Sequence, residues 1–124
     1  LHLALYRRYP EVGAVLHVHS PAATVLSRHL PVGVQLRDYE LLKILPGINT
    51  HAAETWLPVF PNDQDIPRLA AQVDAVMAKH ELAAYLIAGH GIYTWGKTVE
   101  RAWYQLEALE FMLECHYREW LRGQ

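Results

Sequence analysis

Short apolar runs alternate with longer amphipathic stretches along this sequence, and this alternation constrains the fold more than any other feature. Residues 14–19 (AVLHVH) and 83–88 (AAYLIA) each predict a buried strand. Residues 66–80 and 99–121 predict amphipathic helices, because their apolar residues recur at helical spacing. Strands that alternate with helices indicate an α/β domain in which helices cover a sheet.

The remaining segments predict shorter elements. The sequence indicates a helix end before Pro10 and, from its Ser-Pro start, a helix over 21–28. Pro58, within a predicted strand, suits an edge position. The other expected elements are strands over 31–36, 55–60 and 92–95 and helical turns over 39–45.

The chain length indicates one domain. Its 124 residues suffice for a hydrophobic core, so we expect a single domain over residues 1–124. The sequence begins without Met, inside what reads as a helix. We therefore expect that an N-terminal part of the domain is missing.

Composition excludes several classes of function. A net charge of −2 argues against nucleic acid as the main partner, because binding to a polyanion needs a basic surface. No apolar run approaches the roughly 18 residues of a membrane span, and no signal peptide is visible. The single cysteine, Cys115, cannot form an internal disulfide, which fits a cytoplasmic location.

Two histidines lie two residues apart at the end of the first predicted strand. Side chains at positions i and i+2 of a strand point to the same face, so His17 and His19 stand about 7 Å apart at their Cβ atoms. Their rings can then converge on one metal ion. The alternative is a pair of half-buried histidines that bond to backbone carbonyl groups.

A third histidine, His90, sits between two glycines after the buried run 83–88. The glycines let the backbone bend and let a ligand approach closely. Three imidazoles and an open position are the arrangement of a catalytic zinc. The alternative is a bulge that happens to carry a histidine.

Glu40 is the next candidate, beside a short apolar helix about 20 residues after the histidine pair. The alternative is that Glu40 is a solvated carboxylate on the surface of a helix, which is the usual position of a glutamate. That alternative is favoured for Asp38 and Glu54, and His51 is expected at the rim of a cleft.

These residues resemble a known superfamily. HVHSPAATVLSR and AGHGIYTWGKTVERAWYQLEALEFMLE together resemble the class II aldolase/adducin-like superfamily. Within it, DYELLKILPG, LPVFPNDQDIPRLA and HGIYTWGKTVERA are most similar to the methylthioribulose-1-phosphate dehydratases. The resemblance covers essentially all of the chain. It implies a three-layer α/β/α domain with a central, mostly antiparallel sheet covered by helices.

The resemblance also implies a site and a reaction. It implies one zinc ion per subunit on His17, His19 and His90, with Glu40 as the acid/base group. A glutamate suits that role if a partly apolar pocket raises its pKa toward neutrality. The implied substrate is a ketose phosphate, 5-methylthioribulose 1-phosphate, which is dehydrated to a diketone in methionine salvage. The phosphate-binding residues are expected in the missing N-terminal segment. The superfamily further implies a homo-oligomer, with a tetramer favoured.

Two alternatives stay open at this point. Sister enzymes of the superfamily, which are sugar-phosphate aldolases and ribulose-phosphate 4-epimerases, use the same zinc chemistry. In the aldolases the glutamate near the metal lies upstream of the histidine pair, in a region that this sequence does not contain. The second alternative is a metal-free, adducin-like binding scaffold, against which the presence of all three histidines argues.

Overall fold

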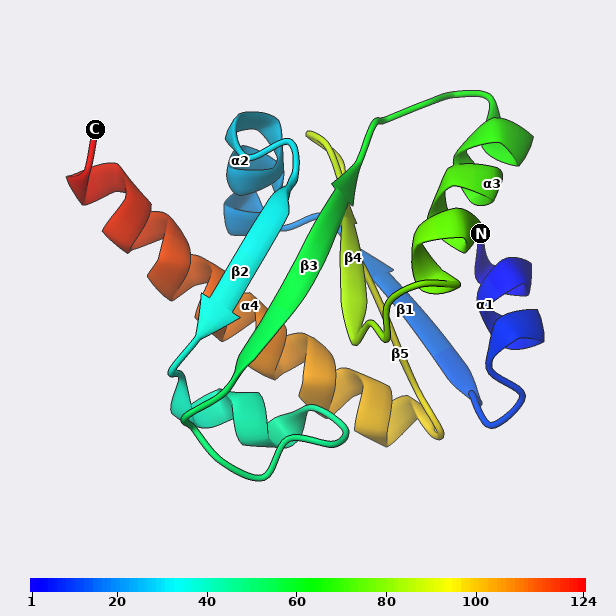
Figure 1. Ribbon diagram of the computed structural model, residues 1–124, viewed down its shortest axis with the longest axis horizontal. Helices are drawn as coiled ribbons and strands as arrows, with labels where there is room; N and C mark the ends of the chain where they lie inside the picture. Colours follow the sequence, from blue (N-terminus) through cyan, green and yellow to red (C-terminus); the bar gives the residue numbers. More distant parts are fainter.

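The computed structural model describes residues 1–124 as a five-stranded sheet with helices on both faces (Figure 1). The strands lie in the order β1-β5-β4-β3-β2. Three of the four strand pairs are antiparallel and the β3–β4 pair is parallel. The elements are α1 (His2–Arg8), β1 (Ala14–Val18), α2 (Pro21–His29), β2 (Gly33–Arg37), the 3₁₀ helix η1 (Glu40–Ile44), β3 (Glu54–Phe60), α3 (Ile66–Met77), β4 (Ala84–Ile87), β5 (Gly91–Gly96) and α4 (Val99–Arg122).

Two hydrophobic clusters, one on each face of the sheet, make the domain three-layered. On one face α2, η1 and α4 pack around buried residues such as Leu26, Leu42 and Leu109. On the other face α1 and α3 pack around a second cluster that includes Leu5 and Leu69. The expected three-layer α/β/α arrangement with a mostly antiparallel sheet is confirmed.

Side-chain caps explain where the main helices begin. Ser20, Asp65 and Thr98 each accept a hydrogen bond from the backbone N–H three residues later, at the starts of α2, α3 and α4. Pro21 follows the first of these caps, where its missing N–H costs nothing. These starts agree with the sequence-based prediction.

Some predicted boundaries differ from the structure. Helix α3 ends at Met77 rather than near residue 80, and the turns after Tyr39 form a 3₁₀ helix. The prediction that Pro58 occupies an edge strand is wrong, because β3 lies between β2 and β4. Strand β3 pairs with β4 only through Val59 and Phe60. Pro58 therefore sits where that side of the strand has no partner.

The register shows which ends of the strands meet. Phe60 at the end of β3 pairs with Ile87 at the end of β4, and Ile87 pairs with Gly91 at the start of β5. Val18 at the end of β1 pairs with Ile92. The carboxyl ends of β1, β3 and β4 thus meet at one edge of the sheet, which we call the histidine edge because His17, His19 and His90 lie there.

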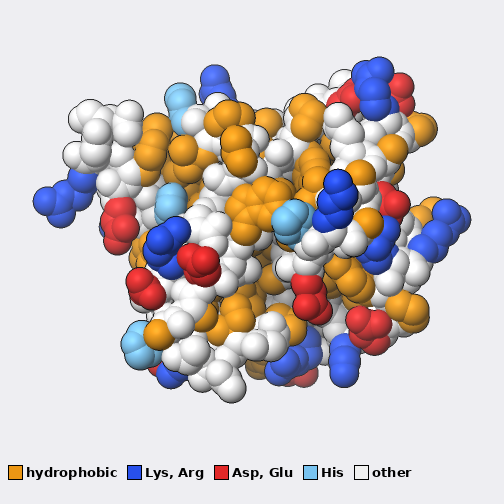
Figure 2. Space-filling model, in the orientation of Figure 1, with side chains coloured by type: hydrophobic (Ala, Val, Ile, Leu, Met, Phe, Trp, Pro, Cys, Tyr) orange, Lys and Arg blue, Asp and Glu red, His pale blue; other side chains and the backbone are white.

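The surface carries no marked excess of one charge on the face seen in Figure 2. Blue and red side chains are interspersed there among apolar ones, in keeping with the net charge of −2. No helix combines the length and the apolar character that crossing a membrane requires.

Candidate metal centre

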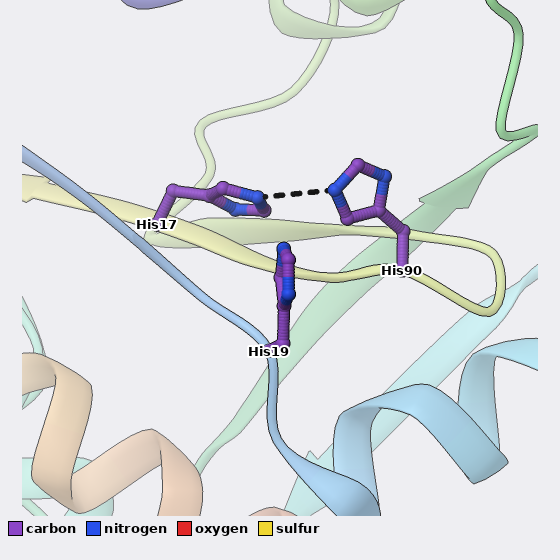
Figure 3. A group of neighbouring side chains, drawn as sticks. All are labelled: His17, His19 and His90. Atoms are coloured by element: carbon purple, nitrogen blue, oxygen red, sulfur yellow. Dashed lines mark hydrogen bonds between the residues drawn. The ribbon is translucent and has the colours of Figure 1, made fainter.

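Three histidines converge at the histidine edge (Figure 3). His17 lies in β1, His19 directly follows that strand, and His90 lies in the turn between β4 and β5. Each offers one ring nitrogen, and the three nitrogens lie within 4.8 Å of one another. His17 and His90 are half-buried, whereas His19 is exposed. The predicted juxtaposition of these three side chains is present in the structure.

Hydrogen bonds orient two of the three rings. The Nδ1 atom of His17 lies 3.0 Å from the carbonyl oxygen of Ile92, and Nδ1 of His90 lies 3.1 Å from Oδ1 of Asn62. Carbonyl and amide oxygens only accept hydrogen bonds, so each Nδ1 carries the proton. In both neutral rings the lone pair is therefore on Nε2.

The two Nε2 atoms face each other at 3.3 Å, along the dashed line of Figure 3. With both Nδ1 atoms protonated, this contact brings two lone pairs together unless a cation lies between them. Burial lowers the pKa of His17, and the neighbouring His90 and His19 add to this decrease, although the hydrogen bond to the Ile92 carbonyl partly offsets it. Tetrahedral ligation with bonds of 2.0–2.1 Å would place two nitrogens about 3.3 Å apart. The histidine pair therefore fits a metal ion such as zinc.

Packing fixes the plane of the His17 ring. His17 is the cross-strand partner of Tyr93, and the two rings stack with centroids 4.1 Å apart. Tyr93 in turn stacks on the buried Tyr85 at 5.1 Å. A ligand with its ring backed by the core loses little freedom when it binds an ion.

Both glycines around His90 have a structural reason. Gly89 has a φ of +66°, a conformation that other residues rarely adopt, and it forms the turn between β4 and β5. A Cβ atom at Gly91 would collide with the carbonyl oxygen of Val18 on the neighbouring strand. The glycines thus allow the tight turn and the close approach of β1 that bring His90 to His17.

Glu40 is not brought to the histidines within this chain. It begins η1, which follows the opposite end of β2, because Arg37 at that end pairs with Glu54 at the start of β3. Its side chain is 70% exposed and bonds to Lys43 at 2.6 Å. That bond lowers the pKa of Glu40, so the increase in pKa that would suit an acid/base role is absent from the single chain. Asp38, Glu54 and His51 are exposed as well.

Two hollows flank the sheet. A groove of about 520 Å³ adjoins His19 and is lined by Val18, Trp103 and Glu110, among others. A larger pocket of about 740 Å³ lies toward the opposite edge of the sheet and includes Trp95. The groove is the hollow that shares a residue with the metal centre.

Sequence reasoning assigned no role to two residues at the centre. Asn62, which bonds to His90, lies in the loop after β3, and Tyr93, which stacks on His17, lies in β5. No signal in the sequence marked Asn62, because the parallel pairing of β3 with β4 that brings it to His90 is a property of the sheet. No pattern in the sequence alone pairs residue 93 with residue 17.

A family model described as the class II aldolase and adducin N-terminal domain matches residues 1–117. The chain belongs to this family. Among curated relatives, the methylthioribulose-1-phosphate dehydratase of Methylococcus capsulatus is 56% identical over 119 residues, which are 95% of this chain and 58% of that protein. The enzyme of the same name from Marinobacter nauticus is 51% identical over 118 residues, 93% of this chain and 57% of that protein. The chain thus spans somewhat more than half the length of these curated relatives.

Solved structures share the fold of this chain. YgbL from Escherichia coli matches with a TM-score of 0.70 at 26% identity, over 92% of this chain and 52% of that one. The L-fuculose-1-phosphate aldolase of Thermus thermophilus matches with a TM-score of 0.66 at 24% identity, over 99% of this chain and 62% of that one. The class II aldolase fold predicted from the sequence is confirmed.

Proposed function

We propose that the protein is a zinc-dependent methylthioribulose-1-phosphate dehydratase, a hydro-lyase of methionine salvage. The curated relatives of that name at 49–56% identity support this proposal. The observation that carries it is the convergence of His17, His19 and His90 with two Nε2 lone pairs directed at one point. A binding scaffold without a metal would have no use for that arrangement.

The three histidines would hold zinc, one ion per subunit. The ion would act as a Lewis acid on a substrate carbonyl group and make the neighbouring C–H bond more acidic. The residues of the chain supply the rest. His17 and His90 are held in the required tautomer, and the open groove beside His19 leaves room for a sugar-phosphate.

We assign the proton transfer to Glu40, acting in the site of a neighbouring subunit. Its carboxylate is exposed at the edge of the sheet opposite the histidines, so it cannot serve the centre of its own chain in this fold. In an assembly the Glu40 carboxylate would no longer contact Lys43 and solvent, and would instead contact the substrate bound by the partner subunit. Dehydration needs a base that takes a proton from carbon and an acid that lets hydroxide leave as water, and one carboxyl group can do both in turn.

The same proposal includes an assembly and a location. Helix α4 exposes several large apolar side chains, which suit contacts between subunits of a homo-oligomer, with a tetramer favoured. These exposed apolar side chains of α4 are Val99, Trp103, Tyr104, Phe111 and Leu121. We also propose that the enzyme is located in the cytoplasm.

The test is zinc content and turnover of 5-methylthioribulose 1-phosphate, measured together on the wild type and on His90→Ala. We expect about one zinc per chain and release of the diketone, with both lost in the variant. Zinc binding without dehydration would instead support the function of a sister aldolase or epimerase. A protein that binds no metal would support the scaffold instead.

A further inference from the structure

We propose that Asn62 is a positioning residue for the metal centre, which holds His90 in the tautomer that directs its Nε2 lone pair at the ion. This inference rests on the proposed metal site, but it concerns affinity for the ion and not the reaction. Asn62 is not itself a candidate ligand of the metal. Its Oδ1 contacts Nδ1 of His90, the ring nitrogen that does not face the other histidines.

The contact itself defines the tautomer. Oδ1 of Asn62 lies 3.1 Å from Nδ1 of His90 and accepts a hydrogen bond from its N–H. A neutral imidazole carries one proton on either nitrogen, and the bond made by one nitrogen decides which of the two is free for a metal. Without an acceptor at Nδ1, part of the His90 population would carry the proton on Nε2 and could not bind the ion.

The backbone holds the two residues at this separation. The N–H of Ala88, in the turn that carries His90, donates to the carbonyl oxygen of Phe60 at 2.8 Å. Phe60 ends β3 two residues before Asn62, and it pairs with Ile87 of the parallel strand β4. The parallel pair therefore ties the loop that carries Asn62 to the turn that carries His90.

Hydrogen bonds inside the loop restrain Asn62 further. Arg68 donates to both carboxylate oxygens of Asp63, and the N–H of Asp65 donates to the same carboxylate at 2.9 Å. Gln64 donates to Oδ1 of Asn62 at 3.4 Å. The segment 61–65 is thus braced against the first turn of α3, so that Asn62 meets the histidine from a defined direction.

The two ordered ligands differ in what holds them. His17 is oriented by a backbone carbonyl group, which every sequence supplies. His90 is oriented by a side chain, which a single substitution can remove. Asn62 therefore gives the sequence a means of setting the affinity of the site without changing a ligand.

The experiment compares zinc affinity in four full-length proteins: the wild type, Asn62→Ala, Asn62→Asp and Gln64→Ala. Affinity is measured by competition with a chelator of known zinc affinity. Partners of this kind are worth 10–100-fold in metal affinity, and because Asn62 is exposed we expect about tenfold weaker binding for Asn62→Ala. Asn62→Asp keeps an acceptor and should bind zinc at least as tightly as the wild type. Gln64→Ala removes one restraint on Asn62 but keeps the bond between Asn62 and His90, so it should weaken zinc binding less than Asn62→Ala does.

A second readout does not depend on the ion. Long-range ¹H–¹⁵N NMR of the metal-free protein should show the His90 proton on Nδ1 in the wild type and a shift toward Nε2 in Asn62→Ala. Equal zinc affinity in wild type and Asn62→Ala, or an unchanged tautomer, would overturn the inference. Zinc binding that depends on Asn62 in a protein that dehydrates nothing would remove the proposed function and leave the inference standing.

Discussion

The Nε2 atoms of His17 and His90 lie 3.3 Å apart although the two residues are 73 positions apart in the chain. Each ring donates a hydrogen bond from Nδ1 outward, His17 to the Ile92 carbonyl oxygen and His90 to Oδ1 of Asn62. The two lone pairs that remain point at each other, which is unfavourable without a cation. Bonds of about 2.0–2.1 Å from a single ion would span this separation, so the pair fits a metal ion held between the two nitrogens.

A bound metal should therefore stabilise the fold. Zinc present at 100 times its Kd should raise the free energy of unfolding by about 2.7 kcal/mol, because it binds only the folded arrangement of ligands. Thermal unfolding with zinc and with a chelator measures the difference. His90→Ala should abolish it, whereas His51→Ala, a control in an exposed loop, should preserve it. The same zinc-induced shift in both variants would contradict ligation by His90.

Glu40 should act across a subunit boundary. Glu40→Gln and His90→Ala should each abolish dehydration as separate proteins, and Glu40→Gln should keep its zinc. When the two variants are unfolded and refolded together, some sites combine intact histidines from one subunit with an intact Glu40 from another. We expect activity to return to a measurable fraction of the wild type in the mixture. Mixed oligomers that stay inactive would show that Glu40 does not act in the site of a neighbouring subunit.

Tyr85→Phe should stabilise the protein. The Tyr85 ring is fully buried between Phe60 and Tyr93, and its hydroxyl group has no hydrogen-bond partner. Removing that hydroxyl relieves the cost of an unsatisfied buried group, for which we expect a gain of about 1 kcal/mol in urea unfolding. Tyr85→Leu, which also removes the stacked ring, should instead lose stability. A loss in both variants would show that the hydroxyl is satisfied.

Glu110 should make stability depend on pH. Burial raises the pKa of its carboxyl group, and Glu114 adds to the increase, although the Ser20 hydroxyl partly offsets both. The folded protein then holds this proton more tightly than the unfolded chain, so stability falls as pH rises above about 4.5, the ordinary value. Glu110→Gln should be more stable than the wild type at pH 7, and the difference should vanish below pH 4.5. Urea unfolding at both pH values measures this.

The matched control for that prediction is Glu107→Gln, one turn earlier on α4 and exposed. It should leave stability nearly unchanged at both pH values, because its carboxylate stays in contact with solvent in the folded protein. An equal gain in Glu107→Gln would trace the effect to the net charge of the helix.

Local chemistry was enough to predict most of the elements. The caps Ser20 and Thr98 and the apolar spacing of α4 are local signals, since a helix start depends on neighbours within one turn. The pair His17 and His19 was equally readable, because alternate residues of a strand share a face. The glycines beside His90 marked a turn for the same local reason.

Only the tertiary structure decided which distant groups meet. The register of β1 against β5 sets Tyr93 beneath His17, and the parallel pair β3–β4 brings Asn62 to His90. The same topology carries Glu40 to the other edge of the sheet. Strand order and register depend on how two cores pack on opposite faces of one sheet, a property of the whole chain that no short stretch of sequence contains.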